Sequence, residues 1–391
     1  MRILFLSQLL PLPLDAGPKI RSYYVLRYLA EAGHEVTLVC LVRPSDRKED
    51  VDALGRICRS VHTIPIVRSR WKNIRDGIRS LSAREPFLIL RDRIPEMHRA
   101  LAELTAGRSF DAVHSDQLWM APYGLKHAGP GLKVLDQHNA VFTIPTQLAA
   151  NQRNPLLRVF LQREAAKLAA FERSACRRFD RVVWVTDGDK KAVFPQDDPG
   201  PVIPIAVDPS CCSPLPRPDP FRITFLGGMH WPPNAEGILW FVRYIWPEVS
   251  RAAPGAVLTL IGKGAPRSLL KKDANSKVEI AGFVPDLQPY LSETAAFIVP
   301  LRSGAGMRVK ILDAWNWGLP VVSTSVGADG IRAVHDDNIL IADDAESFSS
   351  GILRILQDRK LSRRLSENGR STVESLYDWR KVYPAWDGVY R

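Results

Sequence analysis

Short apolar segments that alternate with helical stretches constrain the fold of this chain more than any other feature. Residues 2–7 are apolar, residues 20–32 have helical periodicity that ends at Gly33, and residues 34–40 are apolar again. A strand, a helix and a second strand in this order predict a parallel sheet, because the crossover helix returns the chain in the same direction. Further strands are predicted at residues 112–114, 134–136 and 181–185.

The alternation restarts after a proline-rich segment. Residues 199–220 contain eight prolines, which is typical of a semi-rigid connector. Apolar strands are then predicted at residues 223–226, 257–261, 278–281, 295–299 and 321–323. A chain of 391 residues is too long for one typical core. We therefore predict an α/β protein of two doubly wound, Rossmann-like domains, residues 1–200 and 221–375, joined by a linker at 201–220, with the ligand site in the cleft between them.

Composition excludes several other classes of protein. Hydrophobic residues make up 46% and charged residues 24% of the chain, which is typical of globular proteins. Five scattered cysteines favour neither a disulfide framework nor a zinc site, and they are consistent with a reducing cytoplasm. The first ten residues resemble a signal peptide but are better explained as a buried strand, and no apolar stretch is long enough to span a membrane.

Positive charge is concentrated in the first half of the chain. Residues 1–200 contain 31 Lys and Arg against 22 Asp and Glu, a net charge of +9 out of the total of +11. In residues 68–81, basic side chains are interleaved with Trp71, Ile74, Ile78 and Leu81. This spacing predicts a basic amphipathic helix that lies on an anionic membrane surface, with an ordinary solvated helix as the alternative. No nucleic-acid-binding motif accompanies the charge, so a nucleic-acid partner is not expected.

Glycine-rich turns follow two strands of the second predicted domain. Gly304, Ala305 and Gly306 precede a helix predicted over residues 307–317, with Arg308 and Lys310 in its first turn. Cations there oppose the helix dipole unless an anion lies between them and the backbone amides, so the segment predicts a phosphate site. Asp313 shares the helical face of Lys310 and is a candidate ligand for ribose hydroxyls.

The second of these turns contains Gly227 and Gly228. It continues into residues 231–234, where Asn234 is predicted to cap the next helix. Because the carboxyl ends of parallel strands meet at one edge of a sheet, both turns are expected at one diphosphate site.

Four motifs occur in order in the second half: Phe225-Leu226-Gly227-Gly228, Trp231-Pro232-Pro233-Asn234, Gly282-Phe283-Val284-Pro285-Asp286-Leu287, and the segment Gly304–Val322. Together they resemble the GT4-type family of retaining glycosyltransferases with the GT-B fold. The resemblance implies transfer of a sugar from a nucleotide diphosphate sugar to an acceptor hydroxyl, without a metal or other cofactor and with retention of anomeric configuration. The acceptor would be a glycan, a lipid-linked molecule or a small molecule.

The resemblance also assigns roles to residues. Gly227 and Gly228 would approach the diphosphate, and the backbone beside Phe283 and Val284 would meet the base. Asp313 stands for the second glutamate of the family's paired-glutamate motif, whereas the first falls near Ala305. The phosphates and the donor sugar would contact Gly304, Ala305, Gly306, Met307, Arg308 and Lys310.

In the first half the resemblance is weaker. Gly17 lies in the expected acceptor-binding loop, and Asp116 takes the place of a histidine often found after the strand at residues 112–114, with His114 two residues earlier. Asp116, His138 and Asn139 are the candidates for groups near the anomeric carbon. Residues 376–391 are predicted to form a last helix that returns to the first domain.

Three alternatives remain open from the sequence. Asp187-Gly188-Asp189 has the Asp-x-Asp pattern of metal-dependent glycosyltransferases, although its place after a strand favours an ordinary helix start. The same two-domain architecture would also suit a nucleotide-sugar epimerase. The missing first glutamate leaves a catalytically silent nucleotide-sugar-binding subunit as a third possibility.

Overall fold

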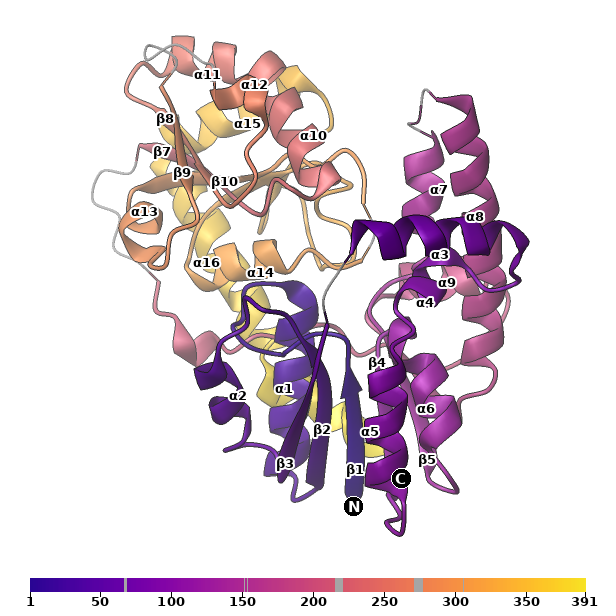
Figure 1. Ribbon diagram of the computed structural model, residues 1–391. Coiled ribbons are helices and arrows are strands. Elements are labelled where there is room, and N and C mark those ends of the chain that lie inside the picture. Colours follow the sequence, from indigo (N-terminus) through magenta and orange to yellow (C-terminus); the bar gives the residue numbers. More distant parts are fainter. Residues whose placement is uncertain (67–68, 151, 153, 215–220, 271–276, 305) are drawn as a thin grey trace. The chain divides into compact units, whose positions relative to one another are not determined.

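The structure, a computed structural model, describes residues 1–391 except 67–68, 151, 153, 215–220, 271–276 and 305 (Figure 1). The end of the predicted linker and the predicted site residue Ala305 therefore lie outside the described residues. The chain divides into two compact units. Unit 1 comprises Met1–Ala206, Ala305–Met307 and Val382–Arg391, and unit 2 comprises Val207–Gly304 and Arg308–Lys381.

Unit 1 is built on a six-stranded parallel sheet of order β3-β2-β1-β4-β5-β6. The strands are β1 (Arg2–Ser7), β2 (Glu35–Val42), β3 (Ser60–Pro65), β4 (Ala112–Asp116), β5 (Leu132–Gln137) and β6 (Arg181–Trp184). The helices are α1 (Gly17–Glu31), α2 (Lys48–Leu54), α3 (Arg70–Ser82), α4 (Phe87–Arg91), α5 (Pro95–Thr105), α6 (Ala121–His127), α7 (Thr143–Ala150), α8 (Pro155–Cys176) and α9 (Asp187–Val193), with a 3-10 turn η1 (Leu118–Met120). The central strand β1 is an almost continuous apolar run because helices cover both faces of a doubly wound sheet.

Unit 2 repeats this plan with a parallel sheet of order β12-β11-β10-β7-β8-β9. Its strands are β7 (Arg222–Leu226), β8 (Val257–Ile261), β9 (Val278–Gly282), β10 (Thr294–Val299), β11 (Val321–Ser323) and β12 (Leu340–Ile341). Its helical segments are η2 (Pro209–Cys211), α10 (Pro232–Trp240), η3 (Phe241–Ile245), α11 (Trp246–Ala252), α12 (Arg267–Leu270), α13 (Gln288–Ser292), α14 (Val309–Asn316), α15 (Ala345–Gln357) and α16 (Arg359–Leu376). Two short segments, α17 (Trp379–Val382) and η5 (Tyr383–Gly388), end the chain.

The expected α/β class with two parallel sheets is confirmed, and ten strands lie where the apolar runs predicted them, within two residues at each end. The sequence analysis missed β3 and β12. β3 is mostly half-buried, so its sequence has no continuous apolar run, and β12 has only two residues. Among the described helices, none is long and apolar enough to cross a bilayer.

A buried ion pair joins three separate segments of unit 1. The Arg21 guanidinium on α1 donates to both carboxylate oxygens of Asp136 at the end of β5, at 2.9 and 2.8 Å, and both side chains are fully buried. Its Nη1 also donates to the carbonyl oxygens of Ile203 and Pro204, at 2.6 and 2.8 Å. The Arg21 side chain therefore holds residues 203–204, just before the chain leaves unit 1, against the sheet.

The end of the chain packs against the same guanidinium. The centre of the Arg21 guanidinium lies 5.7 Å from the ring centroid of Tyr383 and 5.1 Å from that of Trp386. The hydroxyl oxygen of Tyr390 lies 2.6 Å from Nδ1 of His114. The side chains of Tyr383, Trp386 and Tyr390 are all buried. The last ten residues thus complete the core of unit 1.

Replacing Arg21 by alanine should lower the free energy of unfolding of unit 1 by about 3 to 5 kcal/mol, because it leaves the Asp136 carboxylate buried without its main partner. Urea denaturation followed by circular dichroism measures the change. The matched control is Arg27→Ala, which removes an exposed pair with Glu31 and should cost less than about 1 kcal/mol. Equal effects of the two variants would contradict a central role for the buried pair.

Candidate functional site

In unit 2, each of the two glycine-rich turns identified in the sequence follows a strand of the sheet. Gly227 and Gly228 follow β7 directly, and β7 pairs with β10, which leads into the turn at residue 304. A Cβ atom on Gly227 would lie only 2.8 Å from Nζ of Lys310 and 3.0 Å from Nδ2 of Asn234. Glycine is therefore required at residue 227 for these two polar side chains to reach the end of β7.

Lys310 is held at this position by two neighbours. Its Nζ donates to Oδ1 of Asn234 at 2.9 Å and lies 4.7 Å from the ring centroid of Phe225. The amide nitrogen of Asn234 in turn donates to the carbonyl oxygen of Gly228 at 2.9 Å. The prediction that Asn234 caps α10 is wrong. The helix begins at Pro232 with Trp231 at its N-cap, since proline suits the first helical position, and Asn234 instead connects the glycine turn to Lys310.

Burial brings the pKa values of Lys310 and Asp313 close together. Burial and the neighbouring charge of Arg308 lower the pKa of Lys310 to about 7, although Asp313 opposes this change. Burial raises the pKa of Asp313 to about 7, and Lys310 offsets only part of the rise. The carboxylate therefore offsets the charge of Lys310 only in part, and a nearby anion would stabilise the charged lysine.

The helix that carries these side chains starts later than predicted. We expected it to begin at Met307, but α14 runs from Val309 to Asn316 and Arg308 occupies its N-cap position. The preceding turn delays the start, because Gly304 and Gly306 have φ values of 133° and 78°, which are not helical. A Cβ atom on Gly304 would lie 2.6 Å from Nη2 of Arg308, so glycine also lets the guanidinium pack against the turn.

The two residues predicted beside a nucleotide base follow the edge strand β9. Phe283 is 62% exposed, and Nζ of Lys263 lies 4.5 Å from its ring centroid. Val284 is half-buried. An exposed aromatic ring with a cation over one face has the geometry of a stacking surface.

In unit 1, a row of polar side chains crosses the carboxyl ends of three strands. Ser7 on β1 is in register with Asp116 on β4, and Asp116 is in register with Asp136 on β5. Asp116 accepts hydrogen bonds from the hydroxyls of Ser7 and Ser22, at 2.9 and 2.8 Å. The row places Asp116, a predicted site residue, next to the buried Arg21–Asp136 pair.

His138 completes this row. Its Nε2 lies 2.9 Å from Oδ1 of Asp116 and 3.6 Å from Oδ2 of Asp136, and the side chain is 7% exposed. Burial alone would lower the pKa of His138, but the two carboxylates outweigh this effect and raise it to about 9. His138 is therefore a cation at neutral pH and is not available there as a general base.

The loop after β5 that contains His138 and Asn139 is held from two helices. Glu172 on α8 accepts hydrogen bonds from the backbone nitrogens of Val141 and Phe142, at 3.0 and 3.3 Å. Asp189 on α9 accepts one from the nitrogen of Ala140 at 2.8 Å. Asn139 is half-buried in this loop, and Gly17, the other residue predicted on the acceptor side, is the first residue of α1.

The Asp187 and Asp189 pair has structural partners. Thr186 is the N-cap of α9, and its hydroxyl accepts from the nitrogen of Asp189 and donates to its carboxylate. Asp187 lies 3.6 Å from Nζ of Lys190. This arrangement is an ordinary helix start, which occupies both oxygens of Asp189.

Among the described residues, one group has side chains close enough to hold a metal ion. His114, Asp116 and Asp136 offer ligand atoms within 4.8 Å of one another, and all three are buried. The cations of Arg21 and His138 already lie against the two carboxylates.

The sequence analysis missed Gln117, which follows β4. It has φ 73° and ψ 159°, a conformation that is very rare for residues other than glycine, and it is buried with no hydrogen-bond partner for its Nε2 among the described residues. The backbone nitrogen of Gln117 donates to the carbonyl of Asp136 at 2.9 Å, which holds this strained turn. The sequence analysis also missed the pair of Arg21 and Asp136, which lie 115 residues apart along the chain.

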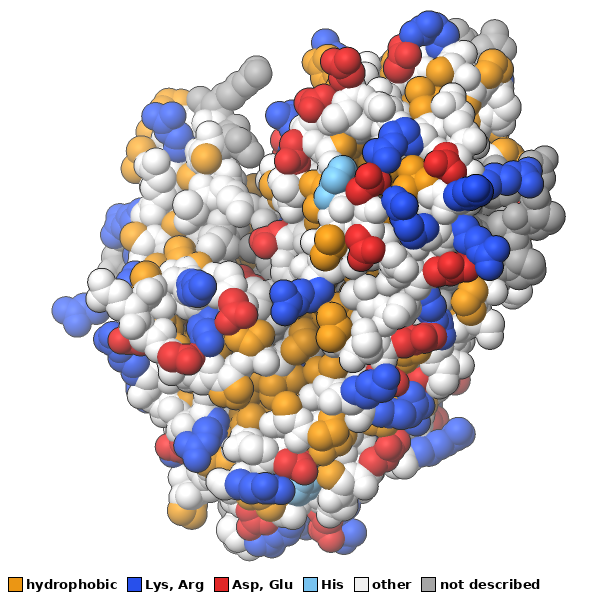
Figure 2. All heavy atoms as spheres, turned by 180° about the vertical axis from the view of Figure 1, so that it is seen from behind, with side chains coloured by type: hydrophobic (Ala, Val, Ile, Leu, Met, Phe, Trp, Pro, Cys, Tyr) orange, Lys and Arg blue, Asp and Glu red, His pale blue; other side chains and the backbone are white. Residues whose placement is uncertain are grey.

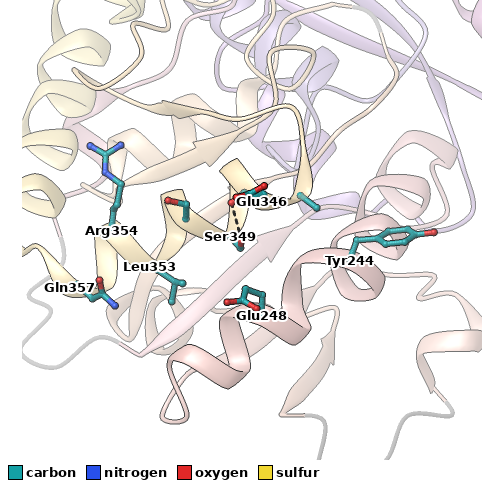
Figure 3. Close-up of a pocket in the computed structure, with 9 residues that line it drawn as sticks. Tyr244, Glu248, Glu346, Ser349, Leu353, Arg354 and Gln357 are labelled. Atoms are coloured by element: carbon teal, nitrogen blue, oxygen red, sulfur yellow. Dashed lines mark hydrogen bonds between the residues drawn. The ribbon is translucent and has the colours of Figure 1, made fainter.

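A separate groove of about 650 Å³ lies on unit 2, between η3 and α11 on one side and α15 on the other (Figure 3). Tyr244, Glu248, Ser349 and Arg354 are among its lining residues. None of the described site residues predicted from the sequence lines this groove. It is therefore distinct from the glycine turns of unit 2.

Comparisons with known proteins agree with this organisation. Residues 17–210 match the family model Glycosyltransferase Family 4, and residues 220–358 match the model Glycosyl transferases group 1. An uncharacterized 44.6 kDa protein in the cps region of Klebsiella pneumoniae is 22% identical over 98% of both chains. The lipopolysaccharide core biosynthesis glycosyltransferase LpsE of Rhizobium meliloti is 31% identical over 36% of this chain and 43% of its own. The crystal structure of Anabaena Alr3699/HepE in complex with UDP has a TM-score of 0.69 at 12% identity, covering 100% of this chain and 99% of that one, and it shares the fold.

The charge on His138 predicts how the stability of unit 1 depends on pH. Because its folded-state pKa of about 9 is above the usual 6.5, its contribution is complete below about pH 6.5 and disappears as the pH rises through 9. Urea midpoints measured across this range should fall with rising pH in the parent protein and much less in His138→Gln. His98→Gln is the control, since burial lowers the pKa of His98 and it does not titrate in this window. The same slope in His138→Gln would refute the assignment.

Proposed function

Because the chain belongs to the family 4 and group 1 glycosyltransferases, which share the GT-B fold, we propose that it transfers a sugar from a nucleotide diphosphate sugar to an acceptor hydroxyl, with retention of configuration and without a metal. One observation carries the proposal. Lys310 places a buried ammonium group, whose charge Asp313 offsets only in part, beside the glycine turn at Gly227 and Gly228. A diphosphate supplies the anion that this arrangement lacks.

The donor is proposed to bind along the carboxyl ends of the unit 2 strands. The diphosphate would lie between Gly227 and Lys310, the ribose would meet Asp313, and the base would lie beside Phe283 and Val284. Exposure of the Phe283 ring supports contact with a base at that position. Because the structurally similar Anabaena protein binds UDP, the first nucleotide to test is UDP, whose base is uracil.

Cleavage of the bond between the sugar and the diphosphate develops negative charge on the leaving group. Fixed cations at Arg308 and Lys310 and the amide groups at the start of α14 would stabilise that charge. In other transferases a metal ion supplies this stabilisation. The fixed cations are the reason for proposing that no metal is needed here.

Unit 1 is proposed to bind the acceptor. Asp116 and His138 form a charged pair at the carboxyl end of its sheet, with Asn139 in the adjoining loop and Gly17 at the start of α1. Because His138 is protonated at neutral pH, its proposed part is to orient and stabilise charge. The relatives in lipopolysaccharide core biosynthesis and in a cps region support a glycan or lipid-linked acceptor.

The proposed reaction is tested by following UDP-glucose, GDP-mannose and related donors with and without a bacterial lipopolysaccharide-core or lipid acceptor fraction. We expect release of nucleoside diphosphate that depends on the acceptor and persists in EDTA. Isomerisation of the donor without acceptor would replace the proposal by an epimerase. Donor binding without turnover would indicate a silent binding subunit, and loss in EDTA with rescue by manganese would overturn metal independence.

Removing the positive charge at the donor site should weaken nucleotide binding selectively. Lys310→Ala and Arg308→Ala should each weaken UDP binding about tenfold or more and leave uridine binding nearly unchanged, since a charge-assisted contact contributes about 1.5 to 3 kcal/mol. Isothermal titration calorimetry measures both ligands. Lys360→Ala, an exposed lysine on α16, is the matched control. Equal losses for UDP and uridine would contradict a phosphate contact.

The lowered pKa of Lys310 adds a proton signature to this binding. A diphosphate would stabilise the charged lysine, so UDP binding should take up protons above about pH 7, and affinity should fall as the pH rises. Titrations in buffers of different ionisation enthalpy report this uptake. It should be reduced in Lys310→Ala.

A further inference from the structure

Helix α3 is oriented opposite to an ordinary surface helix. Its polar residues Lys72, Asp76 and Ser80, which are four apart, face the protein. Nζ of Lys72 donates to Oδ2 of Asp76 at 2.8 Å and to the carbonyl oxygen of Arg91. Asp76 is 3% exposed and Ser80 is fully buried. The inward face of α3 is thus fixed by polar contacts.

The outward face of α3 is apolar. The exposed fractions are 81% for Trp71, 54% for Ile74, 64% for Ile78 and 48% for Leu81. An amphipathic helix normally turns such a stripe toward the core, because burying apolar surface stabilises the fold. Because polar contacts on the inward face of α3 keep this apolar surface exposed, the surface indicates a binding partner outside the chain.

Further exposed apolar side chains lie on the first turns of α8. Leu156 is 81% exposed, Leu157 43% and Val159 62%. The two helices are joined where Nη2 of Arg163 on α8 donates to the carbonyl oxygen of Leu81 at 2.5 Å. Figure 1 shows α3 lying across α8, below the tip formed by α7 and the start of α8. The outward face of α3 and residues 156–159 are called the apolar rim.

The charge around the apolar rim is positive. Arg75 and Arg79 on α3 and Arg158 on α8 are exposed, whereas the one acidic residue of α3, Asp76, is buried against Lys72 and Arg75. Figure 2 shows a different pattern on the face that it draws, where Lys and Arg are interspersed with Asp and Glu. The side chain of Arg70 and residue 68, the first of the predicted basic helix, are outside the description. The rim therefore combines apolar groups with cations and no exposed acidic side chain on α3.

We propose that the apolar rim docks on an anionic lipid bilayer. Trp71, Ile74 and Ile78 would enter the boundary between headgroups and acyl chains, where a ring such as that of Trp71 is favoured. Arg75, Arg79 and Arg158 would contact the anionic headgroups. A protein partner would need acidic groups matched to each arginine, whereas a lipid headgroup layer offers them at any spacing.

Flotation of the full chain with vesicles tests the proposal without any donor or acceptor, so its outcome is independent of the proposed reaction. We expect binding to vesicles of phosphatidylcholine mixed with phosphatidylglycerol, weakening as salt is added, and little binding to phosphatidylcholine alone. Tryptophan emission should shift to the blue on binding, and the shift should be lost in Trp71→Phe.

Two variants and a control separate docking from misfolding. Arg79→Glu with Arg158→Glu should weaken binding at least about tenfold, since each basic residue near the surface contributes about fivefold in affinity. Trp71→Ser with Ile78→Ser should also weaken it, and both variants should keep the parent's thermal midpoint because the replaced side chains are exposed. The control, Lys48→Glu with Arg56→Glu, makes the same change of charge at exposed positions in and just after α2.

Three results would overturn the proposal. They are equal binding to both kinds of vesicle, equal weakening by the control variant, and no binding to anionic vesicles. Concentration-dependent self-association that is lost in Trp71→Ser with Ile78→Ser, without vesicle binding, would assign the apolar rim to a second copy of this chain instead.

Discussion

The structure depends on how each unit compensates charge that is buried at the carboxyl ends of its parallel strands. In unit 1 the cations of Arg21 and His138 face the carboxylates of Asp136 and Asp116, so the buried set is balanced. In unit 2, Lys310 lies near Asp313, and burial opposes the charged form of both side chains. The first set is compensated within the folded unit, whereas under the proposed function the second would be completed by the diphosphate of the donor.

The balanced set also anchors the segments that enter and leave unit 1. Arg21 holds residues 203–204, and the hydroxyl of Tyr383 lies 3.3 Å from the backbone nitrogen of Ala206. On the side of unit 2, the nitrogen of Val207 donates to the carbonyl of Tyr377, and Arg380 makes an ion pair with Asp208. The two chain crossings are thus fixed close to their ends, within each unit, by partners far away in sequence.

Buried polar contacts also determine how α3 is oriented. There, buried polar contacts by Lys72 and Asp76 orient a helix so that its apolar stripe stays in solvent. Under the two proposals, the glycine turn beside Lys310 would bind an anion, and α3 would bind an apolar, anionic surface. A sugar transfer that uses a lipid-linked acceptor would need both.

The sequence by itself determined most of the local elements and the positions of the glycine turns in unit 2. The apolar runs placed ten strands, and Gly227, Gly304 and Lys310 were identified because glycine turns and helix starts are local features with a short spacing. It was less accurate at helix starts, where Pro232 shifted the start of α10 by three residues and the conformation of Gly306 shifted that of α14 by two. Only the tertiary structure decided the charge state of His138, the strain at Gln117, the Arg21–Asp136 pair and the outward orientation of α3. Each of these depends on burial or on partners distant along the chain, and neither is encoded in local spacing.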